Sequence, residues 1–234
     1  SMIEKMLSRS MEHAGMDVGV TRFLRALTQF VMNVFLLFMI AGQLGMDSAS
    51  IVAVLGAAGL ALSLALQQSL GNFAGGLLIL IMKPFRVGDY IISPSGEGRV
   101  SMVGLVYTTI LTTDNKAITI PNGTLSNSTV TNVTAMDKRM LELKVGIAYE
   151  ADIRTAKAVL ERVYREHPMV KKDEDIKVFV DSLGDSSVVL GIRGWVETSD
   201  YWQTRWDILE RIKLSFDEAG IEIPYNKMDV HLKQ

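Results

Sequence analysis

The stretch that decides the fold runs from Ser48 to Met82 and reads SASIVAVLGAAGLALSLALQQSLGNFAGGLLILIM. Its 35 residues carry no charged side chain, and its first half is built mainly from Gly, Ala, Ser and Leu. An uncharged run longer than about 18 residues is typical of a membrane-spanning helix. As a straight helix this run would extend about 52 Å, whereas the hydrocarbon core of a bilayer measures about 30 Å. We therefore expect the helix to tilt strongly or to break.

A break is expected where polar and flexible residues follow the apolar half of the run. These residues are Gln67, Gln68, Gly71 and Asn72, with Gly75 and Gly76 one turn further on. Glutamine has good helix propensity, so residue 68 itself should resist a break. We predict a spanning helix over residues 50–67 and a second helix over residues 69–83 at another angle. The break is expected within residues 67–72 or, alternatively, at residues 75–76.

On a helical wheel the spanning half has one narrow face with small residues on both of its flanks. The narrow face carries Ala53, Gly56, Leu60, Leu64 and Gln67, and the opposite face carries Ile51, Leu55, Leu62 and Leu66. The flanking small residues are Ala57, Ala61 and Ala65 on one side, and Gly59 and Ser63 on the other. Small residues let helices approach closely in lipid. Two such flanks fit a ring of like helices, with Leu60 and Leu64 as apolar collars at its axis; a helix inside an ordinary bundle is the alternative.

A second uncharged stretch, Ala26 to Met46, is long enough for another span and is rich in Phe, Leu, Met and Val. It lacks a small-residue flank, so we expect it to face lipid. Only Asp47 is charged between the two spans, which predicts a tight hairpin. The basic residues that flank the hairpin are Arg22 and Arg25 before it, and Lys83 and Arg86 after it. By the positive-inside tendency both ends lie in the cytoplasm.

The remaining part of the chain has the pattern of two small α+β regions. Five short β-type runs, separated by turn residues, predict a small barrel or sandwich. These runs are Tyr90–Ile92, Gly98–Val106, Tyr107–Thr112, Ala117–Ile120 and Thr129–Val133. The next region has the order β-α-β-β-α-β of the ferredoxin-like split βαβ motif. Its predicted strands are Met140–Ile147, Ile176–Leu183, Val188–Val196 and Met228–Leu232.

The two helices of this last region have clear start and stop signals. Asp152 is expected to cap the first, whose inward residues are Ile153, Ala156, Leu160 and Val163. Asp200 is expected to open the second, and Gly220 to close it. The residues predicted to point inward from this second helix are Trp202, Trp206, Leu209 and Phe216.

Composition and spacing disfavour enzymatic and nucleic-acid functions. The chain has no Cys, and its three histidines, His13, His167 and His231, lie far apart, so we expect neither a metal site nor a cofactor. Asp181 and Asp185 are read as solvated turn residues, because paired carboxylates near a strand end usually are. The net charge is only −2, and the predicted barrel lacks a basic stripe interleaved with aromatics, so no nucleic-acid partner is expected.

Several motifs, occurring in order along nearly the whole chain, resemble the small-conductance mechanosensitive channel (MscS) family. The first motifs are Val54-Leu55-Gly56-Ala57-Ala58-Gly59-Leu60-Ala61, Ala65-Leu66-Gln67 and Lys83-Pro84-Phe85-Arg86-Val87-Gly88-Asp89. The later ones are Ile120-Pro121-Asn122-Gly123, Ile223-Pro224-Tyr225 and Met228-Asp229-Val230-His231-Leu232. The resemblance implies a homoheptamer in a bacterial inner membrane, with its C-terminal region in the cytoplasm. It further implies opening under membrane tension to release ions and small osmolytes during hypo-osmotic shock.

Site residues carry over by position. Leu60 and Leu64 resemble the two leucine rings of a closed gate. The pore-helix packing residues are Gly56, Ala57, Gly59, Ala61, Ser63 and Ala65. The candidate hinge residues are Gln68, Gly71, Asn72 and Gly76. The family commonly has Gly at the positions of Gln68 and Ser63, so this chain departs from it there. The family's first transmembrane helix has no counterpart in this sequence.

Two further groups of residues follow from the family pattern and from position. Phe23 is expected to contact Leu66 and Leu70 and so to couple membrane tension to the gate. The residues expected to meet at the inner membrane interface as an ion pair are Asp17, Lys83 and Arg86.

The implied fold class is a membrane α-helical pore followed by an Sm-like β barrel and a ferredoxin-like αβ domain. The predicted divisions are 1–16, an N-terminal segment; 17–83, the transmembrane hairpin; 84–135, the β domain; and 136–234, the αβ domain. A membrane-anchored scaffold or a transporter subunit is the alternative function.

Overall fold

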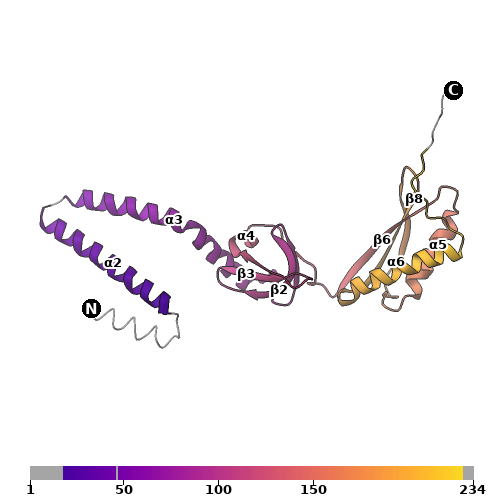
Figure 1. Cartoon of the computed structure of the whole chain (residues 1–234), viewed down its shortest axis with the longest axis horizontal. Coiled ribbons are helices and arrows are strands. Elements are labelled where there is room, and N and C mark those ends of the chain that lie inside the picture. Colours follow the sequence, from indigo (N-terminus) through magenta and orange to yellow (C-terminus); the bar gives the residue numbers. More distant parts are fainter. Residues whose placement is uncertain (1–17, 46, 229–234) are drawn as a thin grey trace, which may run out of the picture. The chain divides into compact units, whose positions relative to one another are not determined.

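The computed structural model of the chain describes residues 18–45 and 47–228 (Figure 1). Contacts divide the chain into two compact units, residues 1–71 and 72–234. The first unit holds two long apolar helices, α2 (Val18–Gln43) and the first part of α3 (Ser48–Met82). Both helices are long and apolar enough to cross a membrane, over Thr21–Gln43 and Ala49–Met82. The prediction of two apolar helices joined by a short connection is therefore confirmed.

Helix α3 is a single unbroken α-helix of 35 residues, so the predicted breaks within residues 67–72 and at residues 75–76 are both wrong. The separate helix predicted over residues 69–83 is wrong for the same reason. Residues 66–70 are good or neutral helix formers, and no proline interrupts them, so each N–H keeps its acceptor one turn back. The first unit contains α3 only to Gly71, a rise of about 36 Å from Ser48. The excess length of the apolar run belongs to the second unit.

The last turns of α3 pack on the β-rich part of the second unit. The helix residues at this contact are Asn72, Gly75, Gly76 and Ile79, which share one helical face by their spacing. Ile79 is buried in the same core as Phe85 and the strand residues Ile91 and Ile110. A Cβ added at Gly76 would lie 2.1 Å from the Leu105 carbonyl oxygen. A Cβ added at Gly75 would lie 2.7 Å from the Asn122 carbonyl oxygen. These two glycines are therefore sites of close approach to residue 122 and to the loop after residue 103 rather than points of bending.

A five-stranded antiparallel sheet follows α3, in the order β4-β3-β2-β1-β5. Its strands are β1 (Tyr90–Ser93), β2 (Gly96–Val103), β3 (Tyr107–Leu111), β4 (Ala117–Pro121) and β5 (Thr131–Asn132). The five predicted strands are thus present, although β2 ends earlier than expected and β5 is shorter. The sequence reading missed the short helix α4 (Asn122–Ser126), which it took for a turn. The last strand, β5, returns to pair with the first.

The C-terminal region packs two helices on a three-stranded antiparallel sheet in the order β6-β8-β7. Its elements are β6 (Lys138–Ile147), α5 (Ile153–Glu166), β7 (Lys177–Leu183), β8 (Val188–Glu197), the 3-10 turn η1 (Thr198–Asp200) and α6 (Tyr201–Glu218). The third strand in the sequence lies between the first two, as a split βαβ motif requires. The predicted strand Met228–Leu232 lies almost entirely outside the described residues.

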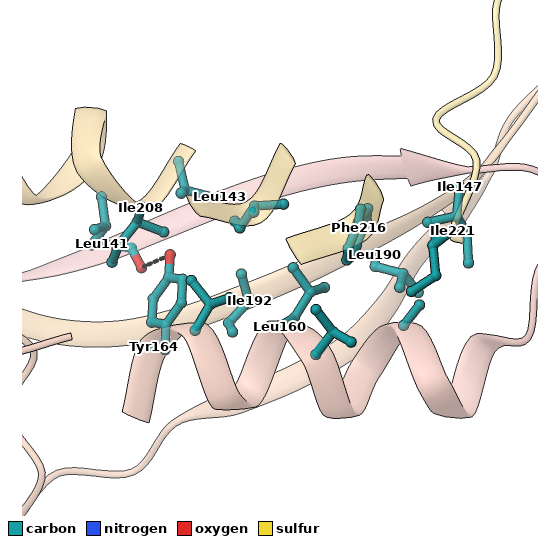
Figure 2. Packing of buried hydrophobic residues seen from close by; sticks show 14 of the residues in the cluster. Leu141, Leu143, Ile147, Leu160, Tyr164, Leu190, Ile192, Ile208, Phe216 and Ile221 are labelled. Carbon is teal, nitrogen blue, oxygen red and sulfur yellow. Dashed lines mark hydrogen bonds between the residues drawn. The ribbon is translucent and has the colours of Figure 1, made fainter. Parts of the chain in front are cut away.

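Figure 2 shows the core of this region, where side chains of α5 and α6 meet those of β6 and β8. Tyr164 is fully buried, and its hydroxyl donates to the Leu141 carbonyl at 3.4 Å. As predicted, the Asp152 carboxylate caps α5 by accepting from the Arg154 and Thr155 N–H groups. Ile153, however, was predicted to point inward and is exposed.

Helix α6 presents a different face to this core from the one predicted. Its buried residues are Thr204, Ile208, Ile212 and Phe216, which recur every four residues. Trp202, Trp206 and Leu209 were predicted inward and are exposed, so of the four predicted residues only Phe216 is buried. The prediction placed the largest apolar side chains in the core, whereas the buried face of α6 is the one that contains Ile208. Asp200 lies in η1 and makes no capping hydrogen bond.

Gly220 closes α6 as predicted. Its φ of 66° is the left-handed conformation that glycine adopts without steric cost. The Gly220 N–H donates to the Asp217 carbonyl at 3.2 Å, and the Ile221 N–H donates to the Phe216 carbonyl at 2.8 Å. This pair of bonds is the Schellman motif, and Ile221 completes it by packing in the same core as Phe216.

His167 is a buried side chain between the end of α5 and α6. Its Nδ1 accepts from the Met169 N–H at 3.3 Å, and its Nε2 lies 3.7 Å from the Asp207 carboxylate with no hydrogen-bond partner. Burial, together with the charge of Arg211, lowers the pKa of His167 below its ordinary value, and Asp207 opposes this shift. A second proton would have to displace the Met169 N–H from Nδ1, so the neutral ring fits the site.

We predict that Gly76→Ala destabilises the protein, because the added methyl group meets the backbone carbonyl of Leu105. The expected loss is about 1–3 kcal/mol, the usual range for overpacking. Gly71→Ala is the matched control, since a Cβ at Gly71 meets nothing within 4 Å of the chain and gains up to about 1 kcal/mol of helix propensity. Thermal unfolding followed by circular dichroism should give a lower midpoint temperature than the wild type for Gly76→Ala and a higher one for Gly71→Ala. Equal effects would contradict the close-contact role of Gly76.

We also predict that the C-terminal region loses stability as the pH falls below about 6.5, the ordinary pKa of an unfolded histidine. Because the pKa of His167 is depressed in the folded state, the unfolded chain takes up the proton first, and its uptake favours unfolding. All three tryptophans lie in β8 and α6, so their fluorescence reports on this region. Denaturant midpoints at pH 7.5 and 5.5 should differ more for the wild type than for His167→Gln. An identical pH response in both proteins would refute the assignment.

Candidate functional site

The candidate site is the N-terminal part of α3. Leu60 and Leu64 lie one turn apart on one face of this helix, and their side chains are 62% and 63% exposed. The described part of this unit therefore leaves both leucines uncovered. A leucine side chain gains about 1.5–3 kcal/mol on full burial, so two exposed leucines on one face favour a partner or an apolar surrounding.

Helix α2 lies against the opposite face of α3. The two helices enclose an open apolar cleft of about 470 Å³. Its lining residues are Phe30, Val31, Val34, Phe35, Phe38 and Met39 of α2, and Leu55, Ala58, Gly59 and Leu62 of α3. Near the hairpin, a Cβ at Gly42 would lie 4.0 Å from the tip of Ile51. The packing of α2 on this side fixes the Leu60–Leu64 face as the side that points away from α2.

The small residues that flank the Leu60–Leu64 face are also exposed. They are Gly56, Ala57, Gly59, Ala61, Ser63 and Ala65. A Cβ added at Gly56 or Gly59 would meet no heavy atom within 4 Å. Close helix approach is the usual reason for such residues in an apolar helix, and no helix within the described residues approaches these two glycines that closely. Within the described residues the flanks are therefore exposed, and Gly59 also lines the cleft with α2.

The residues predicted to couple tension to the gate lie on both helices of the same unit. Phe23 lies on α2, and Leu66 and Leu70 lie on α3; their exposed fractions are 66%, 45% and 59%. The predicted contact of Phe23 with the two leucines stays a prediction.

Of the three residues predicted to form an ion pair at the inner membrane interface, the structure describes two. Asp17 lies outside the described residues. Lys83 and Arg86 follow α3 and are exposed, and Lys83 has a φ of 49°. The backbone N–H of Arg86 donates to the Asp89 carboxylate at 2.8 Å. The ion pair with Asp17 stays a prediction.

A buried polar cluster under the end of α3 was not foreseen. Asn122 is fully buried: its Oδ1 accepts from the Thr108 hydroxyl at 2.7 Å, and its Nδ2 donates to the Gly104 carbonyl at 2.8 Å. The Gly123 N–H donates to Asn72 Oδ1 at 3.1 Å, which ties α3 to α4. The motif Ile120-Pro121-Asn122-Gly123 is the available signal; it predicts a turn and contributes to the family resemblance, but it does not predict a buried amide. Buried amides that satisfy their hydrogen bonds specify one geometry, so this cluster fixes how α3 sits on the sheet.

Among the described residues, no group of three or more His, Asp or Glu side chains is placed to hold a metal ion. The polar side chains of residues 50–66 are only Ser50 and Ser63.

Three family descriptions match the chain in succession. Residues 29–67 match "Mechanosensitive ion channel, transmembrane helices 2/3", and residues 68–135 match "Mechanosensitive ion channel, beta-domain". Residues 141–223 match "Mechanosensitive ion channel MscS, C-terminal". The first match ends close to the point at which contacts divide α3 between the two units.

Relatives and solved structures agree with these matches. The small-conductance mechanosensitive channel of Edwardsiella ictaluri is 38% identical over 232 residues, which cover 99% of this chain and 81% of the relative. An uncharacterised MscS family protein of Buchnera aphidicola subsp. Baizongia pistaciae is 34% identical over 233 residues, covering 100% of this chain and 83% of the relative. The closed-state crystal structure of Helicobacter pylori MscS aligns with a TM-score of 0.89 at 28% identity, over 98% of this chain and 91% of that one.

A more distant structure shares the fold. Arabidopsis thaliana MSL1 aligns with a TM-score of 0.79 at 21% identity, over 95% of this chain and 81% of that one. The predicted fold class, two apolar helices followed by a β domain and an αβ domain, is confirmed. With relatives above 30% identity along its whole length, this chain belongs to the MscS family of mechanosensitive ion channels.

Proposed function

We propose that seven copies of this chain form one channel whose closed gate consists of two leucine rings, Leu60 and Leu64. The observation that carries the proposal is the division of α3 into two faces. Helix α2 and the cleft lie on the Leu55–Leu62 side of α3, whereas the Leu60–Leu64 face points away from α2; the side chains on both sides are exposed within the described residues. Copies of α3 placed side by side along these flanks would direct Leu60 and Leu64 to a common axis.

Such rings would close the pore without a charged plug. A narrow apolar constriction excludes water, and ions do not pass where their hydration shell is lost. Widening the ring would rehydrate it and allow ions and small osmolytes to leave the cell during hypo-osmotic shock. A transporter subunit would need polar or charged groups near the midplane for its substrate, and residues 50–66 offer only two serines.

Helix α2 would receive the force from the lipids. Its exposed apolar side chains include Phe30, Phe35 and Met39. Apolar contact of Phe23 with Leu66 and Leu70 would transmit an outward pull from α2 to the pore helix. This arrangement requires no enzymatic chemistry and no cofactor.

The membrane orientation follows from charge. Arg22 and Arg25 at the start of α2, and Lys83 and Arg86 after α3, would place both ends of the hairpin at the cytoplasmic face of the inner membrane. Asp17 would meet Lys83 and Arg86 there; an exposed ion pair of this kind contributes at most about 1 kcal/mol, enough to bias gating. The proposed domains are residues 17–83, 84–135 and 136–234, after an N-terminal segment of residues 1–16.

The gate is tested by polar substitution. Leu60→Ser or Leu64→Ser should hydrate the constriction and raise the resting leak well above that of the wild type. The measurement is a patch-clamp recording from liposomes, first without suction and then with it. Leu62→Ser is the matched control, because Leu62 lines the cleft with α2 on the other side of the helix, and it should leave the leak unchanged. Tight closure in both gate variants would exclude the two rings.

The flanks are tested by added bulk. Ala61→Val should shift the tension of half-maximal opening, because two more methyl groups press against the Gly59–Ser63 side of the neighbouring helix. Size-exclusion chromatography of the same protein separates a change in gating from a loss of assembly. An unchanged opening tension would indicate that Ala61 faces lipid.

A further inference from the structure

The segment that connects α3 to the sheet, Lys83 to Asp89, is held in a single conformation at several points. Lys83 has a φ of 49°, and its N–H donates to the Ile79 carbonyl at 2.9 Å. A non-glycine residue with positive φ is uncommon, and a following proline disfavours compact conformations further. Tertiary contacts must therefore hold this turn in place.

Two of these contacts come from the sheet core and backbone. Phe85 is 3% exposed and lies in the same core as Ile79 and Ile91. The Gly88 N–H donates to the Val100 carbonyl, and the Val100 N–H donates to the Asp89 carbonyl, both at 2.8 Å. The connection is therefore fastened to β2 at its far end.

The Arg99 guanidinium also donates to the Gly88 carbonyl at 2.5 Å. A second side-chain contact is a bridge between Asp89 and Asn132. One carboxylate oxygen of Asp89 accepts from the Arg86 N–H and from Asn132 Nδ2, each at 2.8 Å. The same Asn132 amide nitrogen also donates to the Pro84 carbonyl at 3.3 Å. Its oxygen accepts from the Thr134 N–H at 3.1 Å, which fixes the orientation of the amide. Hydrogen bonds to a carboxylate are about twice as strong as neutral ones.

Asn132 belongs to β5, 43 residues further along the chain, and β5 pairs with β1 through Ile91 and Ile92. The bridge thus ties the exit of α3 to an edge strand of the sheet. On the other side of the same helix end, Asn72, Gly75 and Gly76 contact α4 and the loop at Leu105. The end of α3 is held on two sides.

We infer that Asp89 and Asn132 are positioning residues for gating: their bridge makes residues 72–82 of α3 move with the β domain as one body. Neither side chain lies on the pore face of α3, so the pair acts through the geometry of the connection. With the bridge intact, tension on the pore helix moves the part of α3 before Asn72, while residues 72–82 stay fixed to the β domain. Without it, the end of α3 keeps only its contacts at Asn72, Gly76 and Ile79, so it is held less tightly and the open state is less well defined. The inference rests on the proposed gate.

The test is a double-mutant cycle on gating. Asp89→Ala and Asn132→Ala should each shift the tension of half-maximal opening. Each should also change the rate of current decay under sustained suction by about threefold or more, as expected for residues in a coupling network. The double variant should be no worse than either single variant, because both remove the same bridge. Single-channel conductance should stay that of the wild type, since the pore face is untouched.

A charge-neutral variant and a surface control sharpen the test. Asp89→Asn keeps an oxygen that can accept from the Arg86 N–H and from Asn132 Nδ2 but removes the carboxylate charge, so its effect on gating should be smaller than that of Asp89→Ala. Asp114→Ala removes a carboxylate that pairs with Lys116 on an exposed turn and should change nothing. If the alanine variants fail to assemble, the milder Asp89→Asn and Asn132→Ser variants are compared in the same way.

Two results would overturn the inference. One is wild-type gating in assembled single variants. The other is a double alanine variant whose effect equals the sum of the two single effects, which would show that the two residues act independently. Failure of the proposed gate gives a different result, because Leu60→Ser would then close tightly whatever the state of the bridge.

Discussion

The uncharged helix α3 is longer than a bilayer is thick, and the rest of the structure accommodates that length. Its first part rises about 36 Å to Gly71, close to the thickness of a hydrocarbon core plus some tilt. The remaining turns stay helical and become part of the β domain's core through Ile79. One continuous helix is therefore a membrane element at one end and a packing element of a soluble domain at the other. The proposed gate and the sheet core thus share one continuous helix.

The glycines of α3 serve two different purposes, and their surroundings distinguish them. A Cβ at Gly56 or Gly59 would meet nothing within 4 Å among the described residues, which leaves room for the proposed neighbouring helix. Gly75 and Gly76 are buried, and the backbone of α4 and of Leu105 lies where a side chain would be. In the proposed channel the first pair would lie between subunits, whereas the second pair permits a fixed contact within one subunit. Small residues in a helix therefore predict a bend only if the segments that pack against them are known.

Much of the architecture could be predicted because it depends on periodicity and turn chemistry. The two apolar helices, the five strands of the β domain, the Asp152 cap and the Gly220 stop all follow from local residue patterns. The predictions that were wrong concern choices between similar local options. On α6, both the tryptophans and the Ile208 row are apolar, and only the sheet decides which of them is buried. In α3, polar and flexible residues permitted a break that the helix does not make.

The sequence by itself determined the class of the molecule: a charge-free helix with small flanks, a second apolar helix and two small α+β regions, in an order that identifies the family. It determined the Leu60–Leu64 face as well, since a helical wheel needs only the order of residues. Only the tertiary structure decided how α3 ends, because that depends on contacts with residues such as Leu105 and Asn122 that lie far along the chain. The same holds for the bridge between Asp89 and Asn132: hydrogen bonds across 43 residues leave no periodic trace in the sequence.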